Sequence, residues 1–352
     1  MGNSRINNRN LVQQMKIKLP SLKKKRVEDA VGLHLAHDIT VIDTDRKEIL
    51  FKKGHKIREE DIEPLKKTGK FFVYVSEDLD TIKGYVHEDE LTTTIANESI
   101  GENLKVSPPG EGKVKVFSTI KGLLKVNVEG LEKLNRIFGV KFATLYTNTV
   151  VQENEIVAYV GFGPLFAPRD DFEKALEIIE KEKPIIEVKK FHRLKVGLIV
   201  TGTEIYNGLI KDKFTPMFRE KLRAFDSDIA MHAILPDDED LIRDKILEFI
   251  EEGCDLVVVS GGLAVDPDDR TTFAIQNTGA EVEFYGAPYF PGSSIMLAYY
   301  NGIPIYGTTA SPIFYKWTTL DILLPRFFAK DRIRREEIVK LGHGGLHVPL
   351  KK

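Results

Sequence analysis

The residues best suited to chemistry lie in three loops of the C-terminal half that mix glycine, hydroxyl and carboxylate side chains. The first loop contains Thr201, Gly202, Thr203 and Glu204. It continues through residues 207–213, which include Asp212, into a predicted helix. Glycines let a backbone approach a phosphate, and the free amides at the start of a helix attract an anion. The loop is therefore a candidate anion site, with an ordinary structural turn as the alternative.

The second loop is an acidic run at residues 235–239. Pro236, Asp237 and Asp238 follow a predicted strand and lead into a predicted helix. Aspartate is a favoured N-cap residue, and acidic side chains suit the positive end of a helix. From the residues alone, capping explains this loop as well as a ligand does.

The third loop is the most informative. It begins with Ser260, Gly261 and Gly262, and it continues to Asp266, Asp268 and Asp269. Three carboxylates so close together are too many for one helix cap. A hard cation such as Mg²⁺, bound by one or two carboxylates and by phosphate oxygens, would explain them. Solvated acids in a surface turn are the alternative.

The elements that must position these loops alternate between short apolar strands and amphipathic helices. The predicted strands are residues 194–201, 228–235, 255–260, 281–285 and 303–307, and the predicted helices are residues 214–225, 238–252, 271–277 and 313–328. This alternation predicts an α/β fold, an open and mostly parallel three-layer sheet. Ligands bind beyond the carboxyl ends of such strands, so we expect the three loops to converge there.

The chain of 352 residues is long enough for two domains. We expect a flexible leader over residues 1–26, a mixed α+β, strand-rich domain over 27–190, the α/β domain over 191–330 and a C-terminal tail over 331–352. In the first domain, residues 113–117 and 123–128 alternate as half-buried strands do, and residues 88–104 and 170–183 show helical spacing.

Composition limits the classes of partner. The formal net charge of −2 gives no overall field that would attract nucleic acid or an anionic membrane. Cys254 is the only cysteine, which excludes an intrachain disulfide and fits a reducing cytoplasm. No apolar run approaches the roughly 18 residues needed to cross a bilayer. We therefore expect a cytoplasmic protein with a small-molecule partner and with neither a nucleic acid nor a membrane partner.

The order of the motifs resembles the molybdopterin-binding domain shared by MoeA-type molybdotransferases, MogA-type molybdopterin adenylyltransferases and CinA-type proteins. The motifs are TGTE at 201–204, GLIKDK at 208–213, LPDD at 235–238 and SGGLAVDPDDRT at 260–271. Later, Pro291 and Gly292 are similar to a PG segment of MoeA. Residues 303–312, which end in Ser311 and Pro312, are similar to its LPGNP segment.

This resemblance implies a ligand and a set of roles. The ligand would be molybdopterin or its adenylylated form, a pterin phosphate or nucleotide. Asp237 and Asp269 would be catalytic and would bind Mg²⁺. The implied substrate-binding residues are Thr201, Gly202, Thr203, Glu204, Asp212, Ser260, Gly261, Gly262, Pro291, Gly292, Ser311 and Pro312. A homodimer is also implied, because MoeA shares its site between chains.

The N-terminal half resembles MoeA only loosely. Residues 27–39 are similar to the opening of that family, and residues 53–75 are similar to an element that in MoeA directly precedes the pterin domain. The DGYA segment of MoeA is missing, as is room for its C-terminal barrel. The resemblance therefore does not carry over molybdate insertion.

Three functions remain open. The first is Mg²⁺-dependent, MoeA- or MogA-like transfer chemistry on molybdopterin or its adenylylated form. The second is a CinA-like nucleotide pyrophosphatase, favoured by the PDDRT letters at 267–271. The third is a non-catalytic pterin carrier or sensor, favoured by the missing DGYA segment and by residues 308–310, where the family has a glycine turn.

Overall fold

A computed structural model describes residues 23–43, 46–76, 84–110, 112–263 and 270–347. The chain divides into two compact units. The first is Met1–Ile120 with Leu124–Val188, and the second is Lys121–Leu123 with Lys189–Lys352. Each unit is described by itself below. In the described part of the chain, no helix is both long enough and apolar enough to cross a membrane.

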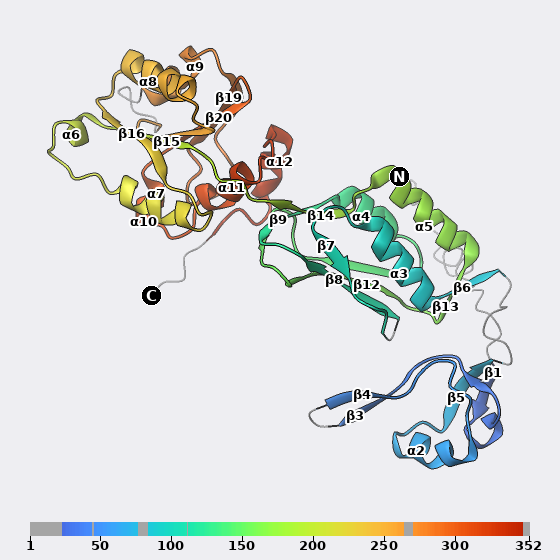
Figure 1. The fold of residues 1–352 in the computed structure, drawn as a ribbon. Helices are drawn as coiled ribbons and strands as arrows, with labels where there is room; N and C mark the ends of the chain where they lie inside the picture. Colours follow the sequence, from blue (N-terminus) through green and yellow to red (C-terminus); the bar gives the residue numbers. More distant parts are fainter. Residues whose placement is uncertain (1–22, 44–45, 77–83, 111, 264–269, 348–352) are drawn as a thin grey trace, which may run out of the picture. The chain divides into compact units, whose positions relative to one another are not determined.

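The second unit is built on a six-stranded sheet with the strand order β16-β15-β17-β20-β19-β18 (Figure 1). The strands are β15 (Val196–Thr201), β16 (Ile229–Leu235), β17 (Leu256–Ser260), β18 (Glu281–Tyr285), β19 (Ile295–Tyr300) and β20 (Ile303–Thr308). The first four strands in this order are parallel, and β19 and β18 are antiparallel additions. The predicted mostly parallel sheet is confirmed, whereas β19 was not predicted.

Helices cover both faces of this sheet, as α8, α9, α7 and α11 show in Figure 1. Leu198 and Val200 of β15 pack in a core with α7 (Phe214–Arg223) and α11 (Thr319–Phe328). Ile199, which points the other way, packs in a second core with α8 (Glu239–Glu251) and α9 (Thr271–Asn277). The three-layer α/β architecture is therefore confirmed.

The last predicted helix is in fact two helices. Residues 313–328 were expected to be continuous, but α10 (Ser311–Phe314) ends before α11 begins. Thr318 starts α11 with a capping box: its hydroxyl and its backbone amide both contact the Asp321 carboxylate. A residue that caps a new helix cannot continue the old one, because the N-cap has an extended backbone.

The predicted C-terminal tail is wrong for residues 331–347. This segment contains α12 (Arg335–Val339) and the 3-10 turn Lys340–Gly342. Ile333 and Ile338 are buried in the first of the two cores, and Leu346 forms a β-bridge with Phe290. The buried Arg326 guanidinium also holds Asp331 and Glu337. Burial of these side chains keeps the segment on the domain.

Residues 84–188 of the first unit form a mixed α+β structure. Its sheets have the orders β10-β12-β8-β7, β11-β9-β14 and β13-β6. The strands are β6 (Tyr85–His87), β7 (Leu104–Val106), β8 (Lys113–Ser118), β9 (Gly122–Val126), β10 (Val140–Thr144), β11 (Val150–Val151), β12 (Ile156–Phe162), β13 (Phe166–Pro168) and β14 (Ile186–Lys190). The helices are α3 (Glu88–Ser99), α4 (Val128–Asn135) and α5 (Arg169–Glu182).

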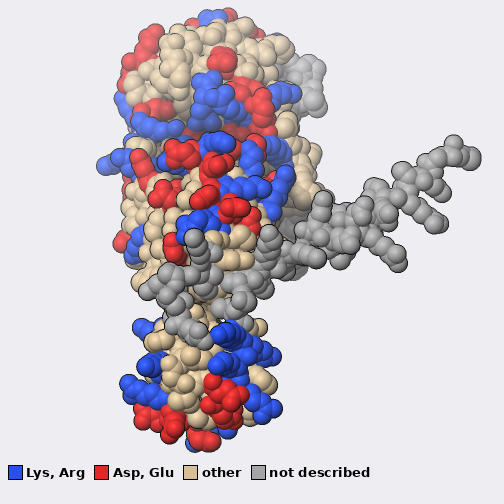
Figure 2. Space-filling model, turned by 90° about the vertical axis from the view of Figure 1, so that its right-hand side faces the viewer, with Lys and Arg blue, Asp and Glu red and all other residues tan. Residues whose placement is uncertain are grey.

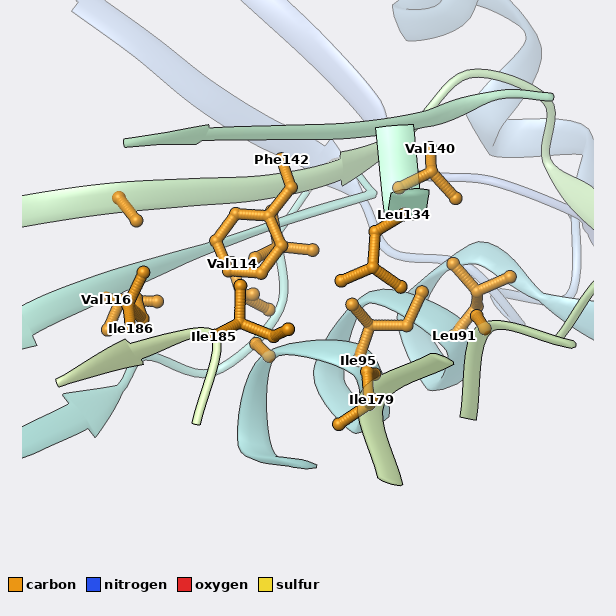
Figure 3. Packing of buried hydrophobic residues seen from close by; sticks show 14 of the residues in the cluster. Leu91, Ile95, Val114, Val116, Leu134, Val140, Phe142, Ile179, Ile185 and Ile186 are labelled. Atoms are coloured by element: carbon orange, nitrogen blue, oxygen red, sulfur yellow. The ribbon is translucent and has the colours of Figure 1, made fainter. Parts of the chain in front are cut away.

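One core holds this structure together (Figure 3). Leu91 and Ile95 of α3 and Ile179 of α5 pack against strand residues that include Val114 and Phe142. The helix predicted over residues 88–104 ends at Ser99, and strand β7 takes up the remainder. The mixed α+β class predicted for this region is confirmed.

Residues 23–76 contain a smaller set of elements with a core of their own. The strands are β1 (Lys23–Arg26), β2 (His34–Leu35), β3 (Ile39–Asp43), β4 (Arg46–Phe51) and β5 (Phe72–Ser76), joined by the 3-10 turns Glu28–Ala30 and Glu59–Asp61 and the helix α2 (Ile62–Lys67). The flexible leader predicted for residues 1–26 is wrong for Lys23–Arg26, because all four residues pair with β5. Residues 1–22 lie outside the described part.

Candidate functional site

Four loops meet at the carboxyl edge of the parallel strands. In the sheet register, Thr201 pairs with Leu235, and Ser260 pairs with Thr308. The strands β15 and β17 are also paired, up to Val200 and Ser260. Because the four strands end side by side, the loops that follow them lie side by side as well. The expected convergence of the three predicted loops is therefore confirmed, while their role in binding remains a prediction.

The glycine turn after β17 is packed tightly against the loop after β15. Gly261 has a φ of +116°, and a Cβ there would lie 2.5 Å from the carbonyl oxygen and 2.5 Å from the Oγ1 of Thr201. The amide of Gly261 donates to the carbonyl of Thr308 (2.9 Å). A Cβ on Gly262 would lie 2.7 Å from Oγ1 of Thr271. These glycines are required by the packing of the edge itself.

Asp237 ties the first predicted loop to the second. Its Oδ2 accepts hydrogen bonds from the amide (2.9 Å) and the hydroxyl (3.1 Å) of Thr203, the first residue of α6 (Thr203–Tyr206). The hydroxyl of Thr203 in turn accepts from the amide of Asp237 (3.3 Å). The other oxygen, Oδ1, accepts no hydrogen bond from any described residue.

The helix cap of α8 is the neighbouring residue, Asp238. Its carboxylate accepts from the amide of Leu241 at 3.0 Å. The capping explanation for the acidic run therefore applies to Asp238. Asp237 instead connects two loops of the carboxyl edge through its hydrogen bonds with Thr203. The two roles could not be separated from the sequence, because the partner of Asp237, Thr203, lies 34 residues away along the chain.

Asp212 caps α7. Its Oδ1 accepts from the amides of Phe214 (2.7 Å) and Thr215 (3.1 Å). The amides expected to attract an anion at this helix are thus already occupied. Glu204 has an exposed side chain, and its carbonyl accepts from the amide of Leu209 (2.8 Å). The Asp212 carboxylate and the Glu204 backbone carbonyl thus hold the loop after β15 through local hydrogen bonds.

The remaining predicted residues lie at the same edge. Strand β19 begins at Ile295, opposite Thr308, so the connection that contains Pro291 and Gly292 reaches the end of β20. The hydroxyl of Thr319 donates to the carbonyl of Gly292. Ser311 lies directly after β20, followed by the buried Pro312.

Two hydroxyl residues of this edge were not singled out from the sequence. Oγ1 of Thr309 lies 2.8 Å from the hydroxyl of Ser311, and the buried Thr271 has its Oγ1 3.4 Å from that of Thr201. Both are in motifs that the sequence analysis quoted. Their signal was the repeated occurrence of hydroxyl residues just after strands.

Of the two proposed metal ligands, Asp237 belongs to the described residues and Asp269 does not. Residues 264–269, which include Asp269, lie outside the described residues. Among the described residues, no three or more His, Cys, Asp or Glu side chains cluster as a metal site would require. A cation at this edge would therefore need Asp237 together with ligands from that segment, from a phosphate or from water.

A cavity of about 360 Å³ lies elsewhere in the second unit. Leu194, Cys254 and Ile303, which line it, are all near the amino ends of their strands. None of the predicted site residues lines this cavity. The carboxyl edge is a set of converging loops with hydroxyl, amide and carboxylate groups, and its chemistry suits a polar, phosphate-bearing ligand.

Two family models match parts of the chain. Residues 197–329 match the family model described as a probable molybdopterin-binding domain. Residues 24–77 match a model described as a domain of unknown function (DUF8806). The first match spans all four parallel strands except for the first residue of β15.

Curated relatives match over a short stretch. A CinA-like protein of Mycobacterium tuberculosis is 32% identical over 77 residues, which are 22% of this chain and 18% of that protein. A CinA-like protein of Mycobacterium leprae is 35% identical over 77 residues, with the same coverage. The aligned stretch thus covers less than a fifth of the length of these relatives.

Solved structures that resemble the chain have low sequence identity. The molybdopterin biosynthesis enzyme MoaB of Thermus thermophilus is 17% identical, with a TM-score of 0.34 over 40% of this chain and 98% of that one. The MoeA protein of Pyrococcus horikoshii is 19% identical, with a TM-score of 0.34 over 92% of this chain and 79% of that one. Residues 197–329 of the second unit are thus similar to the family described as a probable molybdopterin-binding domain.

Proposed function

We propose that this protein binds molybdopterin, or a closely related pterin phosphate, at the carboxyl edge of the second unit. The proposal rests on two findings that concern the same edge of the sheet. The residues that match the molybdopterin-binding family model end their parallel strands at one edge, and there four loops rich in hydroxyl groups and glycine meet.

The polar groups at this edge suit both parts of such a ligand. Hydroxyls such as those of Thr309 and Ser311 can donate and accept, as the edge of a pterin ring requires. Lys211 and Lys213 have exposed side chains in the loop before α7, and neither forms an ion pair with a described residue. Two unpaired ammonium groups beside the edge would favour a phosphate.

We also propose that Mg²⁺ binds with the phosphate. The donor set fits in part, because Oδ1 of Asp237 has no hydrogen bond from the described residues and a hard cation prefers carboxylate oxygens. Asp269 would be the second carboxylate. When bound, the cation would neutralise phosphate charge and orient the phosphate oxygens. The residues of the edge would bind and orient the pterin.

The direct test is whether the purified protein contains a fluorescent pterin after release by acid. We expect it to, and we expect calorimetric titration of the emptied protein with molybdopterin to show tight binding that weakens when Mg²⁺ is chelated. Replacing Lys211 and Lys213 together by Gln should weaken binding about tenfold. The matched control is Lys181→Gln with Lys183→Gln, which makes the same change at the C-terminal end of α5, where Lys183 is the C-cap residue. No pterin and no binding would overturn the proposal.

The second candidate is a hydrolase of nucleotide pyrophosphates, favoured by the CinA-like relatives that match part of this chain. Such an enzyme would use the same edge and the same cation. It would release nucleotide monophosphate from a nucleotide pyrophosphate without retaining a pterin. Hydrolysis by the wild type that is lost in Asp237→Asn, together with the absence of pterin, would establish this function over pterin binding.

A further inference from the structure

One face of the small sheet in residues 23–76 combines cations with exposed aromatic rings. Arg26 pairs with Phe72, and Lys24 pairs with Tyr74, in the antiparallel ladder of β1 and β5. Alternate residues of a strand point to opposite faces. These four side chains therefore share one face, which we call the basic aromatic face.

The aromatic rings are on the outside although the strand has an apolar inner side. Val73 and Val75 of β5 are 2% exposed and belong to the core of this part, whereas Phe72 and Tyr74 are 47% and 46% exposed. The core therefore does not need the two rings. Large exposed aromatic side chains on neighbouring pairs of a ladder are a common feature of surfaces that bind a ligand.

Both cations lie over the ring of Phe72. Nζ of Lys24 is 4.6 Å from the centre of the Phe72 ring, and the guanidinium carbon of Arg26 is 5.8 Å from it. Neither cation forms an ion pair with a described residue. The nearby Glu28 carboxylate is paired with Lys66 at 2.7 Å. Arg26 also helps to lower the pKa of Glu28, after the larger effect of Lys66, so this carboxylate offsets the positive charge of the face only in part.

This part of the chain also has more positive than negative side chains. Residues 23–76 contain thirteen Lys and Arg against ten Asp and Glu, although the whole chain has a net charge of −2. In the lowest lobe of Figure 2, blue side chains border an uncharged strip, and red side chains gather at the lower end. The whole-chain charge, which led us to expect no nucleic acid partner, hides this local excess.

We propose that the basic aromatic face binds single-stranded nucleic acid. Bases would stack on Phe72 and Tyr74, and phosphates would lie against Lys24 and Arg26. Stacking on aromatic side chains beside a cationic groove is how single strands are bound without strict sequence preference. The proposal does not depend on the function proposed for the second unit.

The spacing of the rings explains the choice of a single strand. Residues two apart on a strand are separated by about 7 Å, whereas stacked bases in a duplex are about 3.4 Å apart. Consecutive bases can reach both rings only if they are unstacked and splayed, which single strands allow and duplexes do not.

The test is fluorescence anisotropy of the full-length protein with dye-labelled twelve-nucleotide single strands of mixed sequence, as RNA and as DNA. We expect Phe72→Ala and Tyr74→Ala each to weaken binding about fivefold or more. The matched controls are Phe138→Ala and Tyr146→Ala, which remove rings that are 47% and 90% exposed elsewhere in the first unit. These controls should bind as the wild type does.

The cations are tested separately. Lys24→Gln and Arg26→Gln should weaken binding and reduce the dependence of affinity on salt concentration, since each removes a phosphate contact. Arg58→Gln, an exposed cation of the same part, is the control and should change neither. Circular dichroism of every variant establishes that the fold is intact.

Four outcomes would overturn the proposal. They are no binding of single strands by the wild type at low salt, binding that is unaffected by removal of both rings, tighter binding of a duplex of the same length, and equal losses in the controls. Two further results would assign the face to another partner. These are binding to vesicles with anionic lipid but not to oligonucleotides, and dissociation of a dimer when the rings are removed.

Discussion

At the scale of single residues, the adjacent aspartates Asp237 and Asp238 have different hydrogen-bond partners and different structural roles. Asp238 caps its own helix through Leu241, three residues along. Asp237 accepts hydrogen bonds from Thr203, in the loop after a different strand. A local sequence pattern can identify the first role, because N-caps have a fixed offset from their partners. It cannot identify the second, because that contact exists only once two strands pair.

This difference leads to a prediction for the pair. Asp237→Asn keeps one oxygen that can accept from Thr203 but loses the negative charge that a cation needs. We expect the variant to lose about 1 kcal/mol of stability or less, since Asn accepts such bonds about as well as Asp. We expect it to lose most of the Mg²⁺-dependent part of molybdopterin binding, measured by calorimetric titration with and without Mg²⁺.

Asp238→Asn is the matched control, with the same chemical change one residue away. It should melt near wild type and keep Mg²⁺-dependent binding, because its carboxylate is already used by α8. If both variants bind equally well with Mg²⁺, the cation is held without Asp237. If both lose binding, a general loss of negative charge is the cause, and the special role of Asp237 is wrong.

At the scale of elements, the buried parallel strands were predicted, whereas an antiparallel strand beside them was missed. β15 and β17 are apolar on both faces because helices cover both, so their runs stand out from the polar sequence around them. β19 is equally buried, and the tight turn Asn301-Gly302 joins it to β20, with a positive φ at both residues. Asn-Gly is a strong hairpin signal, so β19 could have been predicted from this turn.

At the start of α3, burial changes the pKa values of two adjacent residues, His87 and Glu88. His87 is the N-cap, and its Nδ1 accepts from the amide of Asp89 (3.1 Å), which requires a neutral ring nitrogen. Burial lowers the pKa of His87, which favours that neutral form. Burial, with the nearby Asp89 carboxylate, raises the pKa of Glu88 to about 7. Two adjacent residues therefore have opposite linkage to pH.

Glu88 and His87 change the folding stability in opposite directions as the pH changes. The folded state holds a proton on Glu88 more tightly than the unfolded state, so this contribution is present at low pH and is lost as pH rises from about 4.5 to about 7. His87 resists protonation in the folded state, so its contribution is present above the usual histidine pKa and is lost as pH falls below about 6.5. The two effects oppose each other in the acidic range.

Glu88→Gln should therefore make the protein more stable than wild type at pH 8 and leave it nearly equal at pH 5. We expect the difference at pH 8 to be about 1 to 2 kcal/mol, reduced from the full linkage value because the side chain is partly exposed. Urea unfolding followed by circular dichroism at several pH values measures it. Glu90→Gln, on an exposed position of the same helix, should show no such trend. A parallel trend in both variants would remove burial of Glu88 as the cause.

At the scale of the whole molecule, the buried cores follow the order of the sequence. One core uses residues between 27 and 75, a second uses residues between 86 and 188, and the two cores on either side of the large sheet use residues between 194 and 338. No core borrows a buried side chain from another stretch. The sequence indicated the change near residue 190 through a change in periodicity, whereas the separate core before residue 76 had no such signal.

Such self-contained cores predict that the second unit folds by itself. A fragment of residues 189–352 lacks only Lys121–Leu123 of this unit, and it keeps every described buried residue of its two cores and the described carboxyl edge. Trp317, the only tryptophan of the chain, lies in this unit and reports on it alone in both proteins. We expect the urea midpoint from tryptophan fluorescence to differ between fragment and full chain by less than about 0.5 M, which corresponds to roughly 1 kcal/mol.

The same fragment separates the two proposed binding surfaces. It should bind molybdopterin as the full chain does, because all described residues of the carboxyl edge are present, and it should not bind single-stranded nucleic acid, because the basic aromatic face is absent. A fragment that is unfolded would show that the large sheet depends on residues before 189. A folded fragment that fails to bind the pterin while the full chain binds it would show that binding needs groups from the first unit.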